Sequence, residues 1–180
     1  MEKISGQKNI RRIALIGPES TGKTTLCPQL AEHYKTVWVP EYARLFMTKL
    51  KREYNYEDVI HCARVQMLTE DEMISQANHF LFCDTELINY KIWFEDKFNK
   101  VPEWLEEEIE KRKYDLYLLT SPDLPWIAEN VRENPTRRKY FFDLYLQELE
   151  IRNFRFRIIS GTGGSRLSLA INLIDSIIHS

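Results

Sequence analysis

The amino-acid sequence predicts an α/β fold in which a five-stranded parallel sheet is covered by helices on both faces. Short apolar runs alternate with helical patterns along the whole chain, which is typical of parallel strands joined by crossover helices. No linker, repeat or low-complexity segment interrupts the 180 residues, a length that fits one domain. We therefore expect a single domain over residues 1–180, with residues 1–10 as a polar lead-in.

Five apolar runs are the expected strands. In order along the chain, they are residues 11–17, 36–40, 79–84, 114–122 and 154–161. The first ends in a glycine, the second is stopped by a proline, and the third carries no charge before its final aspartate. Runs this short and this apolar are typical of parallel strands that are buried on both faces.

Between and after these strands, the pattern changes to helical spacing. The expected helices are, in order, residues 23–34, 41–54, 56–76, 86–98, 102–113, 134–153 and 165–179. In the first helix, Leu26 and Leu30 share one face. The third has a mostly apolar face with two polar interruptions, and the last is amphipathic.

Composition argues against several classes of protein. The formal net charge of −2 leaves no basic footprint for nucleic acid, and no run of about 18 apolar residues predicts a membrane span. The three cysteines, Cys27, Cys62 and Cys83, lie far apart without metal-ligand spacing, which indicates free thiols in a reducing compartment. Because the N-terminus also lacks the apolar run of a signal peptide, we expect a cytoplasmic protein.

Residues 17–24 read GPESTGKT, which satisfies the phosphate-binding pattern GxxxxGK followed by serine or threonine. A strand precedes it and a helix follows it, as a P-loop requires. Backbone N–H groups would surround the phosphates, and Lys23 would place its charge on the β- and γ-phosphates. We expect ATP to be bound by Gly17, Glu19, Ser20, Thr21, Gly22, Lys23, Thr24 and Thr25.

A magnesium ion would need a second anchor besides the Thr24 hydroxyl. Asp84 ends the apolar run FLFCD, so its carboxylate is expected at the carboxyl edge of the sheet, where ligands bind in open α/β folds. Asp84 could ligate the ion directly or through water. The alternative is that Asp84 caps the next helix, and it could do both.

The segment VPEYAR carries the expected acceptor side of the site. Glu41 follows the second strand and so reaches the same edge, where a kinase needs a carboxylate to orient or accept a hydroxyl proton. Arg44, three residues on, could keep Glu41 ionised or contact a phosphate. The alternative is a surface Glu–Arg pair of little energetic value.

Aromatic residues gather near these strand ends. Tyr42, Trp93 and Trp126 could stack on a flat or cationic ligand ring. For each of them taken singly, packing in the core or on the surface is the better-supported role.

Two loops supply further candidates. After the fourth strand, Arg132, Arg137 and Arg138 fall in a proline-punctuated segment that could cover the site and neutralise phosphoryl charge, or face solvent at a helix start. After the fifth strand, SGTGGSR at 160–166 could wrap the adenine, with Arg166 stacked on the base. A plain turn is the alternative for this second loop.

Together these motifs resemble a known family. GPESTGKTTL, VPEYAR, FCDT, YDLYLLTSPDLPW, the arginines at 132 and at 137 or 138, and ISG followed by Arg166 occur in this order. The combination is similar to the nicotinamide riboside kinase domain of NadR-type bacterial NAD-biosynthesis proteins, and to the related stand-alone AAA-domain-like ATPase/kinase family. The resemblance covers roughly residues 10–178.

The resemblance implies a nucleoside/nucleotide-kinase-like P-loop NTPase fold and ATP-dependent phosphorylation of nicotinamide riboside to nicotinamide mononucleotide. Lys23 and Thr24 would lie at the nucleotide, Asp84 near Mg²⁺, and Glu41 or Asp84 at the 5′-hydroxyl. NadR-type proteins carry further domains ahead of the kinase, so we expect neither adenylylation nor DNA-bound repression from this chain. The implied acceptor is a small molecule, with no nucleic acid or membrane partner and with the oligomeric state left open. The alternatives are a kinase of another nucleoside or small metabolite, and a regulatory ATPase that binds a protein.

Overall fold

The computed structural model describes residues 9–129 and 131–178. Five parallel strands form one sheet in the order β2-β3-β1-β4-β5. Their bounds are β1 Arg11–Ile16, β2 Trp38–Val39, β3 Phe80–Asp84, β4 Leu116–Thr120 and β5 Phe156–Ile159. The predicted fold class is confirmed, and the central strand β1 pairs Ala14 with Cys83 on one side and with Tyr117 on the other.

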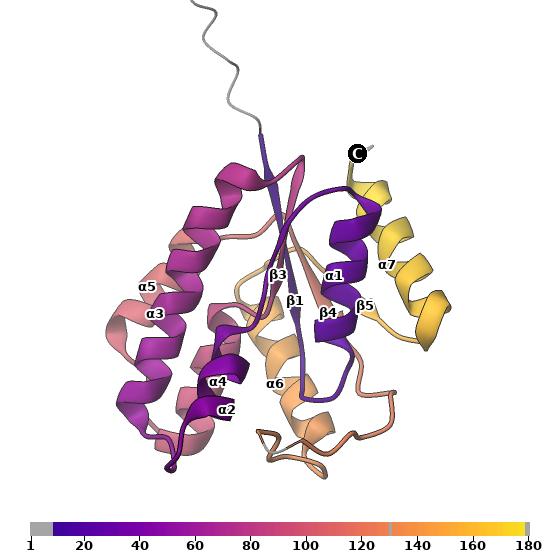
Figure 1. The fold of residues 1–180 in the computed structure, drawn as a ribbon. Helices are drawn as coiled ribbons and strands as arrows, with labels where there is room; N and C mark the ends of the chain where they lie inside the picture. The colour runs from indigo at the N-terminus through magenta and orange to yellow at the C-terminus, as the bar shows by residue number, and fades with distance from the viewer. Residues whose placement is uncertain (1–8, 130, 179–180) are drawn as a thin grey trace, which may run out of the picture.

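Helices cover both faces of this sheet (Figure 1). They are α1 Lys23–His33, α2 Tyr42–Lys49, α3 Tyr56–Met73, α4 Leu87–Phe98, α5 Glu103–Lys111, α6 Arg138–Ile151 and α7 Gly163–Ile178, with a 3-10 turn at Ile74–Gln76. Helices α1 and α7 pack on one face, whereas the group from α2 to α6 lies on the other. The chain therefore forms three layers, with the sheet in the middle.

The alternation of side chains along β1 explains why the protein has two apolar cores. Ile13 and Leu15 point to the face covered by α1 and α7, while Ala14 and Ile16 point to the other face. All four are buried, with exposed fractions of 2% or less. A strand that is buried on both sides must be apolar at every position, which is why the strands read as continuous apolar runs.

Several helix boundaries differ from the prediction by one to five residues. Helix α2 ends at Lys49 instead of continuing to residue 54, because Asn55 begins α3 with a capping box shared with Asp58. Helix α6 begins at Arg138 instead of residue 134, because Asn134 precedes Pro135, which disfavours the helical conformation at Asn134. Helix α7 begins at Gly163, so the loop after β5 is shorter than expected.

The three cysteines are buried and form no disulfide with one another. Their predicted free thiol state is thus confirmed, although the compartment stays a prediction. Across residues 9–129 and 131–178, we find no helix with the length and apolarity that crossing a membrane requires.

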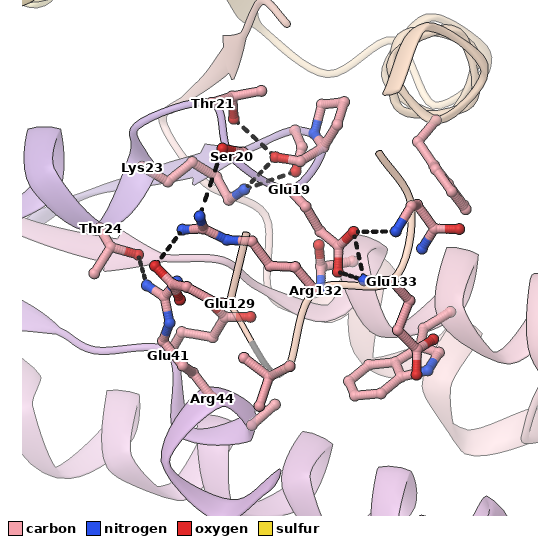
Figure 2. Close-up of a pocket in the computed structure, with 18 of the residues that line it drawn as sticks. Glu19, Ser20, Thr21, Lys23, Thr24, Glu41, Arg44, Glu129, Arg132 and Glu133 are labelled. Carbon is pink, nitrogen blue, oxygen red and sulfur yellow. Dashed lines mark hydrogen bonds and ion pairs between the residues drawn. The ribbon is translucent and has the colours of Figure 1, made fainter. Parts of the chain in front are cut away.

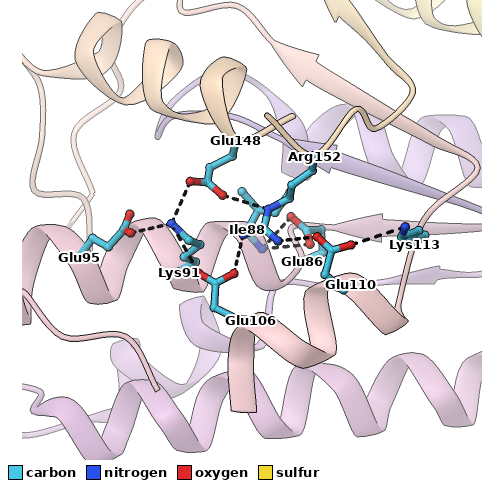
Figure 3. A network of polar contacts seen from close by, with 9 residues as sticks. All are labelled: Glu86, Ile88, Lys91, Glu95, Glu106, Glu110, Lys113, Glu148 and Arg152. Carbon is cyan, nitrogen blue, oxygen red and sulfur yellow. Dashed lines mark hydrogen bonds and ion pairs between the residues drawn. The ribbon is translucent and has the colours of Figure 1, made fainter. Parts of the chain in front are cut away.

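A polar network joins helices α4, α5 and α6 (Figure 3). Lys91 of α4 donates to Glu148 of α6 at 2.8 Å, and Arg152 at the end of α6 pairs with Glu110 of α5 at 2.8 Å. Next to this network Glu86 caps α4, with both carboxylate oxygens accepting from the Ile88 N–H at 2.9 and 3.0 Å. Burial raises the pKa of Glu86 to about 8, so this carboxyl group is a protonated cap at neutral pH.

Glu86→Gln is expected to stabilise the protein at alkaline pH. The folded protein holds a proton on Glu86 between pH 4.5, its ordinary value, and about pH 8, whereas the unfolded chain has lost it, so stability falls as pH rises through this window. Glutamine keeps the capping oxygen and carries no charge, so the variant should gain about 2 kcal/mol or more at pH 9 and little at pH 4.5.

Urea unfolding at both pH values measures this difference. The exposed Glu32 of α1 offers a matched control, and Glu32→Gln should change stability by the same small amount at both. A Glu86→Gln protein that is no more stable than wild type at pH 9 would contradict the assignment.

Candidate active site

The carboxyl ends of the parallel strands converge on one edge of the sheet, and a single cavity of about 1140 Å³ opens there. The P-loop after β1, the start of α2, the face of α4 and the loop after β4 line it. Figure 2 shows residues of these segments pointing toward one another. The cavity brings together these sequence-predicted residues: Gly17, Glu19, Ser20, Thr21, Gly22, Lys23, Thr24, Thr25, Glu41, Arg44, Trp93, Arg132 and Arg166.

The P-loop packs tightly against the end of β4. Gly17 has a φ of +136°, and a Cβ there would lie 2.5 Å from the Thr120 hydroxyl, so only glycine fits. The Thr120 hydroxyl bonds the Thr21 hydroxyl at 2.6 Å and donates to the Ile16 carbonyl at 3.1 Å. The end of strand β4 therefore fixes the backbone conformation of the P-loop.

Lys23 is the first residue of α1, after Gly22 at a φ of +82°. Its buried ammonium donates to the carbonyls of Gly17 and Pro18, both at 2.8 Å, and burial lowers its pKa. The helix N-terminus and this ammonium give the cradle the positive potential that a polyphosphate needs.

Asp84 is fully buried at the tip of β3, and both of its carboxylate oxygens lack a hydrogen-bond partner among the residues described. It does not cap α4, because Glu86 does; the expected capping alternative is therefore wrong. Burial raises the pKa of Asp84, and Lys23 opposes that shift. A buried carboxylate beside the Thr24 hydroxyl is a fitting anchor for a divalent cation whose remaining ligands are phosphate and water oxygens.

Glu41 precedes α2 and lines the cavity near Lys23 and Asp84. The pKa of Glu41 is raised to about 7, mainly by burial and secondly by repulsion from Asp84. Arg44, one turn along α2, donates to the Thr24 hydroxyl at 3.1 Å instead of pairing with Glu41. The alternative of a surface Glu41–Arg44 pair is thus absent from the described contacts, although the charge of Arg44 still lowers the pKa of Glu41, and Glu41 faces the cavity with a proton affinity suited to general base chemistry.

The loop after β4 is joined to the P-loop by hydrogen bonds (Figure 2). The Glu19 carboxylate accepts from the backbone N–H groups of Glu133 and Asn134, at 3.2 and 2.9 Å. The Ser20 hydroxyl accepts from the Ile127 N–H at 2.9 Å. Arg132 extends over the cradle toward Ser20, with 3.5 Å between the guanidinium and the hydroxyl. The loop therefore covers the cradle in this structure.

Some predicted residues lie outside the lining of the cavity. The Tyr42 hydroxyl bonds His61 of α3, Trp126 lies against Arg138, and Arg137 pairs with Asp96 while its guanidinium covers Tyr140. Of Arg132, Arg137 and Arg138, Arg132 is the one that lines the cavity.

Arg166 lines the cavity but is 4% exposed and already pairs with Asp123 at 2.8 Å. It also donates to the carbonyls of Gly161, Thr21 and Ser121. Its guanidinium therefore braces the P-loop from the start of α7, which leaves stacking on adenine a prediction.

Sequence reasoning missed several residues that the fold brings to the site. The Trp93 indole donates to the Tyr54 hydroxyl at 3.2 Å, and Tyr54 and Asp96 line the same end of the cavity. Glu129 of the loop after β4 pairs with both Arg44 and Arg132. These residues sit outside recognisable motifs. The Glu129–Arg132 pair is local, but the Trp93–Tyr54 and Arg44–Glu129 contacts span 39 and 85 positions, so no local pattern could have indicated them.

Comparison with known proteins gives one family and several relatives. The model of a family described as an AAA domain matches residues 12–166. The trifunctional NAD biosynthesis/regulator protein NadR of Escherichia coli (strain K12) is 26% identical over 174 residues, which cover 92% of this chain. The chain spans 42% of the length of that relative.

Solved structures agree on the fold. A crystal structure of NadR protein in complex with NR has a TM-score of 0.78 at 21% identity and covers 93% of this chain and 50% of that one. A deoxyadenosine kinase from M. mycoides with bound dATP has a TM-score of 0.55 at 12% identity, over 92% and 99%. The resemblance drawn from the motifs is therefore confirmed, as is the kinase-like P-loop fold.

Proposed function

We propose an ATP-dependent small-molecule kinase function for this chain, which belongs to the AAA domain family whose model matches residues 12–166. The observation that carries the proposal is that one and the same cavity is lined by the P-loop, Glu41 and Trp93. Its volume of about 1140 Å³ exceeds that of a typical site for one ligand, so a nucleotide and an acceptor could bind side by side.

In this proposal each charged residue has a separate task. Lys23 and the cradle N–H groups hold the β- and γ-phosphates, while Glu41, which lines the cavity, accepts the proton of the acceptor hydroxyl. Arg132 and Arg44 neutralise charge on the transferring phosphoryl group. In-line transfer then depends mainly on positioning and charge neutralisation.

Thr24 and Asp84 would hold Mg²⁺ when it is bound, because Asp84 is a buried carboxylate next to the Thr24 hydroxyl. The ion would neutralise phosphate charge there. Since Asp84 does not line the cavity, this assignment leaves Glu41 as the residue that reaches the acceptor.

The proposed acceptor is the 5′-hydroxyl of nicotinamide riboside, with nicotinamide mononucleotide as product in NAD salvage. The NadR relatives support this choice by name, and so does the chemistry of the cavity. Trp93 and Tyr54 offer aromatic surfaces, which suit a pyridinium cation. Another nucleoside is the second candidate, because a deoxyadenosine kinase shares the fold.

The test is a phosphorylation assay with ATP and Mg²⁺ against nicotinamide riboside and a panel of nucleosides. We expect stoichiometric formation of nicotinamide mononucleotide and ADP, and a rise in melting temperature with the riboside because a ligand that binds only the folded state stabilises it. Transfer to a different nucleoside alone would leave the kinase function standing and remove this acceptor. ATP hydrolysis with no acceptor at all would favour a regulatory ATPase.

A further inference from the structure

A carboxylate of this chain lies among the cationic groups that face the phosphate cradle. Glu129, in the loop after β4, pairs with Arg44 of α2 and with Arg132 of its own loop, the latter at 3.0 Å. Arg44 in turn donates to Thr24, and Arg132 reaches Ser20. Figure 2 shows the Glu129 side chain between the two guanidinium groups, close to the end of the P-loop.

We propose that Glu129 is an internal counter-anion of the phosphate cradle, which holds Arg44 and Arg132 until the terminal phosphates of a bound nucleotide displace it. The inference rests on the proposed binding of ATP. It adds a competition between Glu129 and the terminal phosphates for the two arginines, which phosphoryl transfer itself does not require. It makes Glu129 a determinant of nucleotide affinity, although the residue would have no contact with the bound nucleotide.

The charge distribution around the cradle supports this competition. Glu19, Glu41 and Asp84 already act on Lys23 as neighbouring negative charges. A polyphosphate adds several more, so a Glu129 side chain retained beside it would be strongly repelled. The guanidinium groups, in contrast, gain from the exchange because phosphate oxygens accept bidentate hydrogen bonds at least as well as a carboxylate does.

The exposed fractions of the three side chains indicate which of them moves when a nucleotide binds. The side chain of Glu129 is 38% exposed, whereas those of Arg44 and Arg132 are 24% and 14% exposed. Glu129 can therefore turn into solvent without leaving a buried charge behind, while the arginines stay over the cradle. In this way the arginines are released from the Glu129 carboxylate when the nucleotide arrives.

Equilibrium binding tests the proposal. The dissociation constant of a non-hydrolysable ATP analogue with Mg²⁺ is measured by calorimetry for wild type, Glu129→Gln and Glu129→Ala, with AMP as a second ligand. We expect both variants to bind the analogue about fivefold more tightly, the size expected of a half-exposed ion pair, and AMP with unchanged affinity because it has no terminal phosphates.

Glu133→Gln is the matched control. Glu133 carries the same charge on the same loop, but its carboxylate pairs with Lys97 of α4 at 2.6 Å instead of an arginine over the cradle. Its affinity for the analogue should stay within about twofold of wild type. Equal tightening in Glu133→Gln would mean that any lost negative charge suffices, and this would overturn the specific role of Glu129.

The remaining outcomes separate this inference from the kinase proposal. Unchanged or weaker binding of the analogue by both folded Glu129 variants, with binding by wild type, would overturn the inference and leave the kinase proposal standing. Absence of analogue binding by every folded protein would overturn the nucleotide site, and the inference with it. Melting curves establish which variants are folded.

Discussion

Replacing Lys23 with alanine is expected to lower the turnover number of the proposed kinase by about a hundredfold or more while the fold stays intact. The ammonium is buried in the cradle and, among the residues described, donates hydrogen bonds to the carbonyls of Gly17 and Pro18, so it is held ready for an anion. Its loss removes a positioned charge that opposes the negative charge of the transferring phosphoryl group, and few other groups could replace it.

Steady-state rates with nicotinamide riboside and ATP, together with circular dichroism and thermal melts, measure this effect. Lys49→Ala provides the control, because Lys49 is exposed at the end of α2 and does not line the cavity. Its turnover should match wild type. A folded Lys23→Ala protein with wild-type turnover would show that the P-loop does not serve phosphoryl transfer.

Glu41→Gln is expected to reduce phosphoryl transfer by two orders of magnitude or more, about the contribution of a general base, with a far smaller change in ATP affinity. Glutamine keeps the size of the side chain but cannot take the hydroxyl proton. Because Glu41 makes no capping hydrogen bond to α2, the substitution should cost little stability. Single-turnover rates report the transfer step, and calorimetric titration reports nucleotide binding.

The pH profile gives Glu41 a second signature. Its pKa is raised to about 7, so the fraction of ionised base falls as pH is lowered through neutrality rather than near 4.5, its ordinary value. The wild-type kcat/KM for the acceptor should therefore decline tenfold for each pH unit below about 7. Glu41→Gln should show a flat, low profile over this range; a decline that persists in the variant would assign the titration to another group.

The sequence predicts the parts of this site that lie in short contiguous motifs. The glycine pattern of residues 17–24 needs only its own strand and helix to form a cradle, and Asp84 reaches the sheet edge because its strand ends there. Strand direction alone places Glu41 at the same edge. In each case the local pattern and the topology of a parallel sheet determine the position.

The sequence does not predict which side chains pair with one another across the cavity. Whether Arg44 binds Glu41, Thr24 or Glu129 depends on how a loop 85 positions away packs, and that packing is set by tertiary contacts. The same holds for Arg137, which pairs with Asp96 of α4 although it is adjacent to the P-loop partner Arg138. The segment before α6 is also held by a tertiary contact, since the Asn134 N–H donates to Glu19.

The brace formed by Arg166 has a consequence for how the chain acquires its activity. This arginine supports the Thr21 carbonyl across 145 positions of sequence, so the phosphate cradle is closed by a segment that leaves the ribosome long after the cradle itself. Forming a contact between residues so far apart in sequence costs loop-closure entropy, and this cost arises before the contact stabilises the fold. Nucleotide affinity is consequently a late property of the nascent chain, acquired once α7 has docked beside α1.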